Sequence, residues 1–401
     1  MVRAGLATDE QFLGAVAALK PTVRAFQDQV EREGRIPPAL VESLRQAGLY
    51  RMVVPRSLGG LEVALPTFFR AVELLSEGDA SVGWNVANNA TNQLMALSLA
   101  DEAVAEMFGD SASPPDPIMA GTAVAGGGQA TRVEGGYIVS GRWSFGSGCL
   151  ESDWMVANFV TVHDGQPELN DDGTPILRRV FFPAADTRVI ETWDMTGMRG
   201  TGSHDWSVEQ VFVPARRTVR VPGALFVNQW QRWPGPLYAV TIHAWVGPHH
   251  SVVATGIARA GIDALLELAG AKVPRGRTTL LREQTLVQDA LARADAVLSA
   301  GQAFRERVIG HVWRRVLDGQ PTSVQDHARC KLAATYAVDS ARQAMDLVYR
   351  AGGTTSSRRT HPLARCWRDL HVVAQAASIA PEWYALAGQA MLDLDPGPRL
   401  A

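Results

Sequence analysis

The stretch GGYIVSGRWSFGSG, residues 135–148, decides how the rest of the chain is interpreted. Its first part suits a β-strand, whereas residues 141–148 crowd two aromatic residues and two serines among three glycines. A flat ligand would explain this mixture, because its apolar face favours aromatic contact, its polar edge needs a hydroxyl, and glycine lets backbone come close. The alternative is a glycine-rich strand end whose aromatic residues belong to the core.

Composition excludes several classes of protein. The chain has 401 residues, 46% hydrophobic and 20% charged, which is typical of a soluble globular protein with two or three subdomains. A formal charge of −3 offers no basic field for nucleic acid. The sequence predicts no membrane span and no signal peptide, and its three scattered cysteines predict no metal site and a cytoplasmic location.

Three patterns follow one another along the chain and predict an α+β fold. Residues 1–112 carry apolar residues three and four apart, as amphipathic helices do. Residues 113–222 carry short β-rich runs separated by Gly, Asp and Pro turns. Residues 223–401 return to helical periodicity in four long segments, which are 237–270, 278–316, 324–351 and 363–391.

Several short strings in the same order resemble the acyl-CoA dehydrogenase superfamily over nearly the whole chain. They are GLYRMVVPRSLGGLE (48–62), TGMRGTGSHDWSVEQVFVP (196–214), the pair Arg277 and Gln288 eleven residues apart, and RAGGTTSSRRTHPLARCWRDLH (350–371). The resemblance implies an N-terminal helical domain, a central β-barrel-like domain and a C-terminal four-helix bundle. It also implies a homotetramer assembled through that bundle.

The resemblance implies a flavin site built from both halves of the chain. Ser147 would lie near N5 of the isoalloxazine ring, and Arg277 would reach the pyrophosphate, often across a subunit boundary. The alternative for Arg277 is a solvated side chain at a helix start. The resemblance favours FAD over FMN, but FMN stays open because Leu280 replaces an aromatic residue of the family. The full expected cofactor-binding set is Trp143, Phe145, Ser147, Arg199, Thr201, Ser203, Arg277, Gln288, Gly352 and Gly353.

A missing carboxylate separates this chain from the true acyl-CoA dehydrogenases. Their catalytic glutamate commonly lies nine residues after the arginine of the RD pair, a position held here by Ala377. Without a positioned base, abstraction of a proton beside a carbonyl would lose roughly 10²–10⁴-fold in rate. The chain is more similar to the flavin-dependent monooxygenases of this fold, which implies reduced flavin from a separate reductase, O2 as co-substrate, and a C4a-hydroperoxide that oxygenates a small aromatic or heteroatom-containing substrate.

Two other functions stay open at this stage. One is an acyl-CoA dehydrogenase or oxidase whose base has moved to another helix. The other is a degenerate flavin-binding homologue without catalysis, because two histidines common among the related hydroxylases are replaced by Asn92 and Ala376.

The candidate catalytic residues follow from these departures. Ser147 is expected to donate a hydrogen bond to the flavin–oxygen adduct, and His371 is either an active-site imidazole or a helix-surface or packing residue. Asn92 is a candidate through its place in the sequence. An aromatic-rich segment that enters the C-terminal domain is either a substrate pocket or ordinary core. The expected substrate-pocket residues are Trp84, Asn92, Trp233, Tyr238 and His243.

Overall fold

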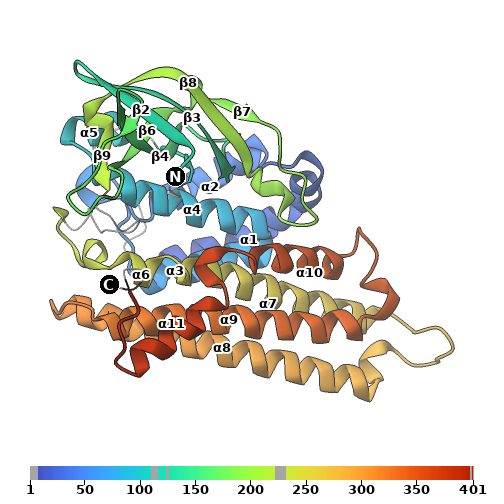
Figure 1. Ribbon diagram of the computed structural model, residues 1–401. Coiled ribbons are helices and arrows are strands. Elements are labelled where there is room, and N and C mark those ends of the chain that lie inside the picture. Colours follow the sequence, from blue (N-terminus) through green and yellow to red (C-terminus); the bar gives the residue numbers. More distant parts are fainter. Residues whose placement is uncertain (1–7, 110–115, 123–125, 222–231, 398–399, 401) are drawn as a thin grey trace.

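The computed structural model of this chain describes residues 8–109, 116–122, 126–221, 232–397 and 400. The predicted domain boundaries at 112/113 and 222/223 fall outside these residues. Figure 1 shows the sheet at the top, the long C-terminal helices at the bottom, and most helices of the N-terminal segment between them. The N-terminal helices are α1 (Asp9–Glu33), α2 (Pro38–Gln46), α3 (Leu65–Gly78), α4 (Ala80–Ala96) and α5 (Asp101–Phe108).

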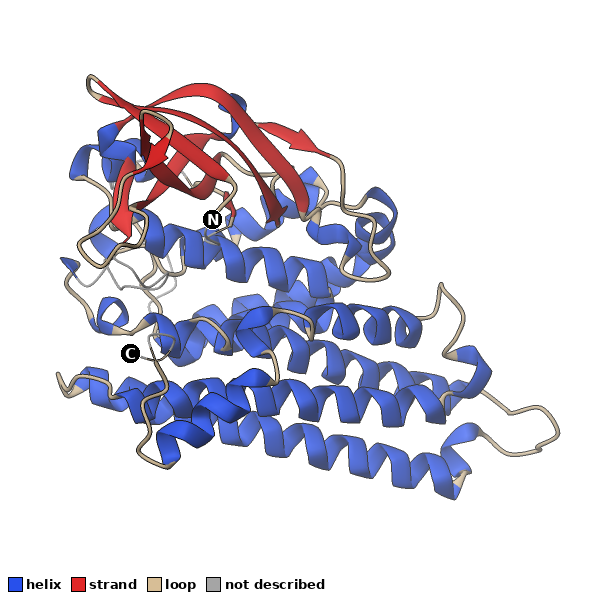
Figure 2. Cartoon of the chain, viewed as in Figure 1, coloured by secondary structure: helices blue, strands red, loops and turns tan. Residues whose placement is uncertain are grey.

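In the described residues, nine strands form one mixed sheet (Figure 2). The strand order is β7-β8-β3-β2-β4-β6-β9, with β1 and β5 also paired to β4. Most pairs are antiparallel, whereas β1 and β2 run parallel to β4. The strands are β1 (Met119–Gly121), β2 (Gly128–Val133), β3 (Gly136–Gly146), β4 (Trp154–His163), β5 (Gln166–Pro167), β6 (Leu177–Pro183), β7 (Arg188–Ile190), β8 (His204–Pro214) and β9 (Thr218–Val221).

The C-terminal helices pack side by side beneath the N-terminal ones (Figure 1). They are α6 (Ile242–Trp245), α7 (Pro248–Ala271), α8 (Thr285–Leu317), α9 (Val324–Ala351), α10 (Pro362–Val373) and α11 (Glu382–Met391). None of the helices in the described parts of the chain combines the length and the apolar character that crossing a bilayer requires.

Two predicted helical segments are divided in the structure. The segment 237–270 becomes α7 only from Pro248, because Gly247 has a φ of 105° and proline suits the first helical position. The segment 363–391 divides into α10 and α11. Ala380, which precedes Pro381, is extended with a ψ of 154°, as expected before proline.

A buried charge cluster joins α3 to the C-terminal bundle. One oxygen of Glu73 accepts hydrogen bonds from Thr255 at 2.5 Å, Gln302 at 3.0 Å and Arg305 at 3.0 Å, and the other accepts from Arg70 at 2.8 Å. Burial alone would raise the pKa of Glu73, but Arg305 and these donors lower it to about 2. The cluster therefore holds a fully satisfied carboxylate between α3, α7 and α8.

Candidate functional site

Phe145, near the end of β3, combines strain with exposure. Its φ is 65°, a left-handed conformation that is rare for a bulky side chain, and it is 64% exposed. The ladder between β3 and β8 is irregular between Trp143 and Gly146, which turns Phe145 outward. The edge of Trp193 meets its ring with centroids 6.3 Å apart. Such strain costs about 1–3 kcal/mol and clusters at functional sites, so Phe145 marks a candidate binding surface.

A chain of three hydroxyl groups begins two residues further on. The Trp84 indole N–H, on α4, donates to Ser147 Oγ at 3.0 Å. Ser147 Oγ lies 2.7 Å from Ser203 Oγ, and Ser203 Oγ lies 2.7 Å from Thr201 Oγ1. Thr201 Oγ1 donates to the Met198 carbonyl oxygen at 2.8 Å. The chain thus runs from an N–H group on α4 to a carbonyl in the 194–202 loop.

The RD pair of α10 holds this loop in place. Arg368 Nε donates to the Thr196 carbonyl at 2.8 Å, and Asp369 accepts from the Met198 N–H at 2.6 Å. The Trp193 indole donates to the same Met198 carbonyl at 2.9 Å. Burial raises the pKa of Asp369 to about 7, although the Met198 hydrogen bond opposes the shift. The RD motif acts here as the anchor of the 194–202 loop.

An imidazole lies on the other side of Trp84. His250, at the start of α7, stacks on the Trp84 ring with centroids 4.0 Å apart and an interplanar angle of 9°. Its Nδ1 lies 2.6 Å from Ser378 Oγ and its Nε2 lies 3.4 Å from Asn88 Oδ1. Asn88 Nδ2 donates to the Trp84 carbonyl at 3.0 Å, so Asn88 turns its oxygen to His250.

Burial favours the neutral form of His250. In that form Nε2 donates to Asn88 Oδ1, which can only accept, and Nδ1 accepts from the Ser378 hydroxyl. Burial lowers the pKa of His250 well below the ordinary value of 6.5, and the neighbouring His249 and Lys331 lower it further. Ser378 follows Ala376 and Ala377 directly, so His250 contacts the turn that occupies the position of the family's catalytic groups.

The sequence analysis did not single out His250, Asn88 or Ser378. His250 lies within the aromatic-rich segment for which a substrate pocket was considered, but no spacing links it to Trp84, 166 positions earlier in the chain. The only sequence signal was the histidine pair at the start of a helix.

Two of the expected cofactor-binding residues make contacts within the chain. Trp143 is 3% exposed, donates to the Asn158 carbonyl at 3.0 Å and stacks on Trp206 in the core of the sheet. Arg199 donates to the Glu31 carbonyl at 3.3 Å and pairs with Asp194 at 3.3 Å, which ties the loop to α1.

The remaining cofactor candidates lie at one end of the bundle. Arg277 is exposed in the loop between α7 and α8, which projects from the bundle in Figure 1, and Gln288 is exposed in the first turns of α8. Gly352 and Gly353 end α9, and the Gly352 carbonyl accepts from Lys272 at the base of that loop at 2.9 Å.

Most of the expected substrate-pocket residues bond to backbone carbonyls. Asn92 is 6% exposed and donates to Met119 at 3.1 Å. The Tyr238 hydroxyl, fully buried, donates to Val53 at 3.0 Å, and the Trp233 indole donates to Leu97 at 2.8 Å. The fourth, His243, is buried with its ring 4.6 Å from that of His327. Of this expected set, Trp84 alone contacts Ser147 in the described structure.

His371 lies on a different side of α10 from the RD contacts. Its Nδ1 donates to the Trp367 carbonyl at 2.8 Å, and its ring lies 4.1 Å from that of Trp367. Trp367 in turn donates to Asp346 of α9 at 3.0 Å. The structure thus places His371 beside α9, whereas Asp369 faces the loop that carries Met198.

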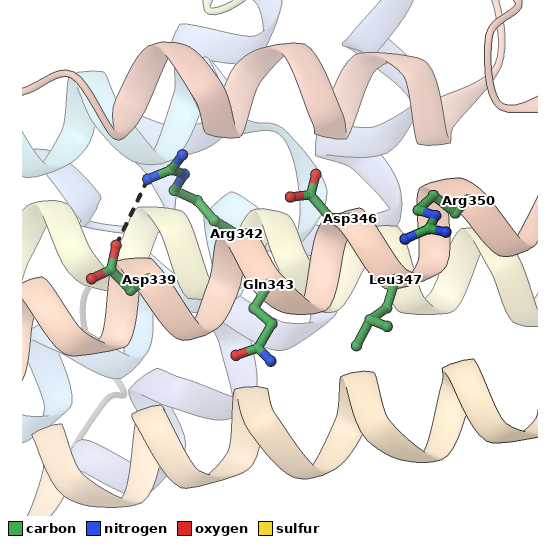
Figure 3. A pocket seen from close by; sticks show the side chains of 6 residues that line it. All are labelled: Asp339, Arg342, Gln343, Asp346, Leu347 and Arg350. Carbon is green, nitrogen blue, oxygen red and sulfur yellow. Dashed lines mark ion pairs between the residues drawn. The ribbon is translucent and has the colours of Figure 1, made fainter.

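A shallow hollow of 380 Å³ follows α9 at the surface of the bundle. Figure 3 shows its lining side chains, with an ion pair between Asp339 and Arg342 at 3.8 Å. Arginines and aspartates of opposite charge alternate along it, so it carries no concentrated charge and no group of the hydroxyl chain. The lining residues are Asp339, Arg342, Gln343, Asp346, Leu347 and Arg350.

Comparison with known proteins identifies the family. Residues 10–107 match the N-terminal domain of acyl-CoA dehydrogenase, and residues 249–381 match its C-terminal domain. An indole-3-acetate monooxygenase from Pseudomonas putida is 31% identical over 388 residues, which cover 94% of this chain and 92% of that protein. The chain belongs to the flavin-dependent monooxygenase branch of the acyl-CoA dehydrogenase superfamily.

Further relatives agree with this placement among the flavin-dependent monooxygenases. The oxygenase component of an FADH2-dependent resorcinol hydroxylase from Rhizobium sp. (strain MTP-10005) is 25% identical, with 96% of this chain and 95% of that protein covered. The solved structure of XiaF from Streptomyces sp., in complex with FADH2 and glycerol, is 26% identical, with a TM-score of 0.86 over 97% of this chain and 96% of that one. The expected family, fold class and flavin-dependent monooxygenase activity are confirmed, as is the dependence on reduced flavin.

The residues around Phe145 suit a reduced flavin. An exposed aromatic ring matches the apolar face of isoalloxazine, and the half-buried Ser147 hydroxyl beside it matches a polar ring edge. A Cβ on Gly146 would lie 2.9 Å from the Trp206 side chain, so this close approach of backbone and core requires glycine.

Proposed function

We propose that this enzyme is the oxygenase component of a two-component system acting on a small aromatic substrate. Reduced flavin from a separate reductase supplies two electrons and two hydrogens, and O2 supplies both oxygen atoms. One oxygen atom enters a C–H bond of the substrate as a hydroxyl group, and the other leaves as water while the flavin is oxidised. The observation that carries the proposal is the exposed, strained Phe145 next to the Ser147 hydroxyl chain.

The flavin face of the site is assigned to Phe145 and Ser147. An aromatic ring held outward by the backbone supports the isoalloxazine without rearranging, which lowers the entropy lost on binding. Closing this surface against a flat ligand also removes water, which protects reactive oxygen species from side reactions. This chain contributes the surface, its orientation and its hydrogen bonds, whereas the bound flavin supplies the oxygen chemistry.

The substrate side is assigned to Trp84 and His250. An indole and a neutral imidazole in parallel contact form a flat surface suited to an aromatic ring. Apart from the bond between the Trp84 indole and Ser147, the hydrogen-bond partners of Trp84, Ser147 and His250 among the described residues are hydroxyl, amide and carbonyl groups. A neutral imidazole with a lowered pKa is a weak base, so the site favours electron-rich rings that need no prior deprotonation.

Arg277 is assigned to the flavin that is bound by a second copy of the chain. Its loop projects from the bundle, and its exposed guanidinium is suited to pair two phosphate oxygens of a flavin at once. The proposal therefore includes a homotetramer, with FAD favoured over FMN, working in the cytoplasm beside its reductase.

Isotope incorporation tests the proposed function. The enzyme is mixed with photoreduced FAD, 18O2 and a panel of aromatic compounds that includes indole-3-acetate and resorcinol. We expect one 18O atom per product molecule by mass spectrometry, and tenfold less product with Phe145→Asn. The proposal would fail if no panel compound gained 18O, or if the product oxygen came from water. If acyl-CoA, added without oxygen, bleached the bound oxidised flavin, the enzyme would be an acyl-CoA dehydrogenase and the proposal would fail.

A further inference from the structure

The hydroxyl chain has a fixed direction, which follows from counting its hydrogens. The Met198 carbonyl can only accept, so the Thr201 hydroxyl donates its one hydrogen to this carbonyl. Ser203 must then donate to Thr201 at 2.7 Å, and Ser147 must donate to Ser203 at 2.7 Å. At the far end the Trp84 N–H can only donate, and it takes one lone pair of Ser147.

Ser147 is left with one unused lone pair and no free hydrogen. It is partly exposed, whereas Thr201 is 1% and Ser203 is 4% exposed, so it is the member of the chain that a ligand reaches. Its expected role as a donor toward the flavin therefore differs from its place in the structure, where its hydrogen goes to Ser203. The hydroxyl hydrogens of Thr201 and Ser203 are likewise donated within the chain, so neither group can donate to a ligand.

We infer that the chain presents Ser147 to the flavin as a hydrogen-bond acceptor, and that the site thereby selects the reduced ring. Reduced flavin carries a hydrogen on N5, which Ser147 can accept, whereas oxidised flavin has a lone pair on N5. Two lone pairs facing each other across a dry contact repel, and each leaves the other unsatisfied. The inference rests on the proposed placement of flavin against Phe145 and Ser147.

Thr201 and Ser203 act in this scheme as positioning residues, because they reach the ligand through Ser147 alone. The anchor of the chain is secure, since the Met198 carbonyl also accepts from Trp193 and the Met198 N–H is held by Asp369. If the Ser147 hydroxyl rotated its hydrogen toward a ligand, its hydrogen bond to Ser203 would break. This would not apply if the hydroxyl chain lost the Met198 carbonyl as its terminal acceptor.

Thr201→Val tests the direction without touching Ser147. Valine matches threonine in shape but cannot accept from Ser203, so Ser203 turns its hydrogen to Ser147, and the Ser147 hydrogen becomes free to donate. We expect the ratio of the dissociation constants of oxidised and reduced FAD to fall about tenfold. For a two-electron couple this lowers the reduction potential of the bound flavin by about 30 mV.

Thr91→Val is the matched control. Thr91 is also buried, donates to the Ala87 carbonyl and accepts from an indole, that of Trp245, at 2.9 Å. Thr91→Val should leave the ratio of the two FAD dissociation constants unchanged. Ser203→Ala should lower this ratio, as Thr201→Val does. Ser203→Ala also serves if Thr201→Val fails to fold.

The outcomes separate this inference from the proposed function. Anaerobic titrations of wild-type enzyme with reduced and oxidised FAD come first, followed by both variants and the control. An unchanged ratio in Thr201→Val and Ser203→Ala, or an equal change in Thr91→Val, overturns the inference while the flavin site stands. A wild-type enzyme that binds neither form overturns the proposed function itself.

Discussion

Two buried polar clusters in this molecule differ in what they leave open. At Glu73 both carboxylate oxygens are satisfied by donors from three helices, and the carboxylate itself is buried although Arg70 reaches the surface. At Ser147 a chain of equally short hydrogen bonds leaves one lone pair of Ser147 Oγ without a donor, beside the exposed ring of Phe145. Burial and short distances are common to both, so the unused capacity at a half-exposed end is what distinguishes the candidate site.

Removing the cation of the Glu73 cluster should have the largest effect. Arg305→Met leaves a buried carboxylate without its main partner, and we expect the free energy of unfolding to fall by about 3–5 kcal/mol. Urea unfolding measures this loss. Arg293→Met is the control, because its ion pair with Asp289 is exposed on the surface and should cost less than about 1 kcal/mol. Equal losses would show that the Glu73 cluster is no more structural than the surface.

The anchor of the hydroxyl chain should make stability depend on pH. Burial raises the pKa of Asp369 to about 7 in the folded protein from 3.8, so the folded state binds the proton more tightly. Its contribution to stability is therefore full at low pH and falls as pH rises through about 7, by up to about 1.4 kcal/mol per pH unit.

Asp369→Asn should remove that slope, because the amide oxygen still accepts from the Met198 N–H but does not titrate. Melting temperatures between pH 5 and pH 8 measure it, with the exposed Asp289→Asn as control. A variant that keeps the wild-type slope would assign the pH dependence to the other buried carboxylates, such as Glu151, whose pKa burial also raises to about 7.

Phe145 should show the smallest change in stability. Phe145→Asn places a residue that tolerates left-handed backbone at this position, so we expect unchanged or up to about 1 kcal/mol higher stability. Binding of reduced flavin should weaken about tenfold, because the exposed ring no longer supports the ligand.

Phe212→Asn is the matched control, since Phe212 is 49% exposed and, unlike Phe145, does not have a positive φ. It should lower stability slightly and leave flavin binding unchanged. A clear loss of stability in Phe145→Asn would show that the ring serves packing and not a ligand.

The sequence predicted the order of the elements and the segment that carries the site, but not the orientation of its side chains. Trp143 and Phe145 are two residues apart and would share one face of a regular strand. The irregularity before Gly146 leaves Trp143 in the core and turns Phe145 outward. The amino-acid sequence of the segment does not reveal this irregularity.

Partners distant in sequence were equally hidden. His250 lies within the aromatic-rich segment, yet only folding shows that it stacks on Trp84 and contacts the turn at Ser378. Asn92 was chosen by its spacing from Trp84, but its amide serves the backbone of β1. Spacing predicts which residues share a helix, whereas hydrogen-bond partners depend on how several elements meet.

The bond between Met198 and Asp369 spans 171 residues, which has a consequence for synthesis of the protein. The segments that carry the hydroxyl groups, directly after β3 and directly before β8, leave the ribosome long before α10 does. The last acceptor in the chain is therefore fixed only when translation is nearly complete, and a nascent polypeptide that ends before residue 362 would hold the sheet but leave Met198 without this anchor.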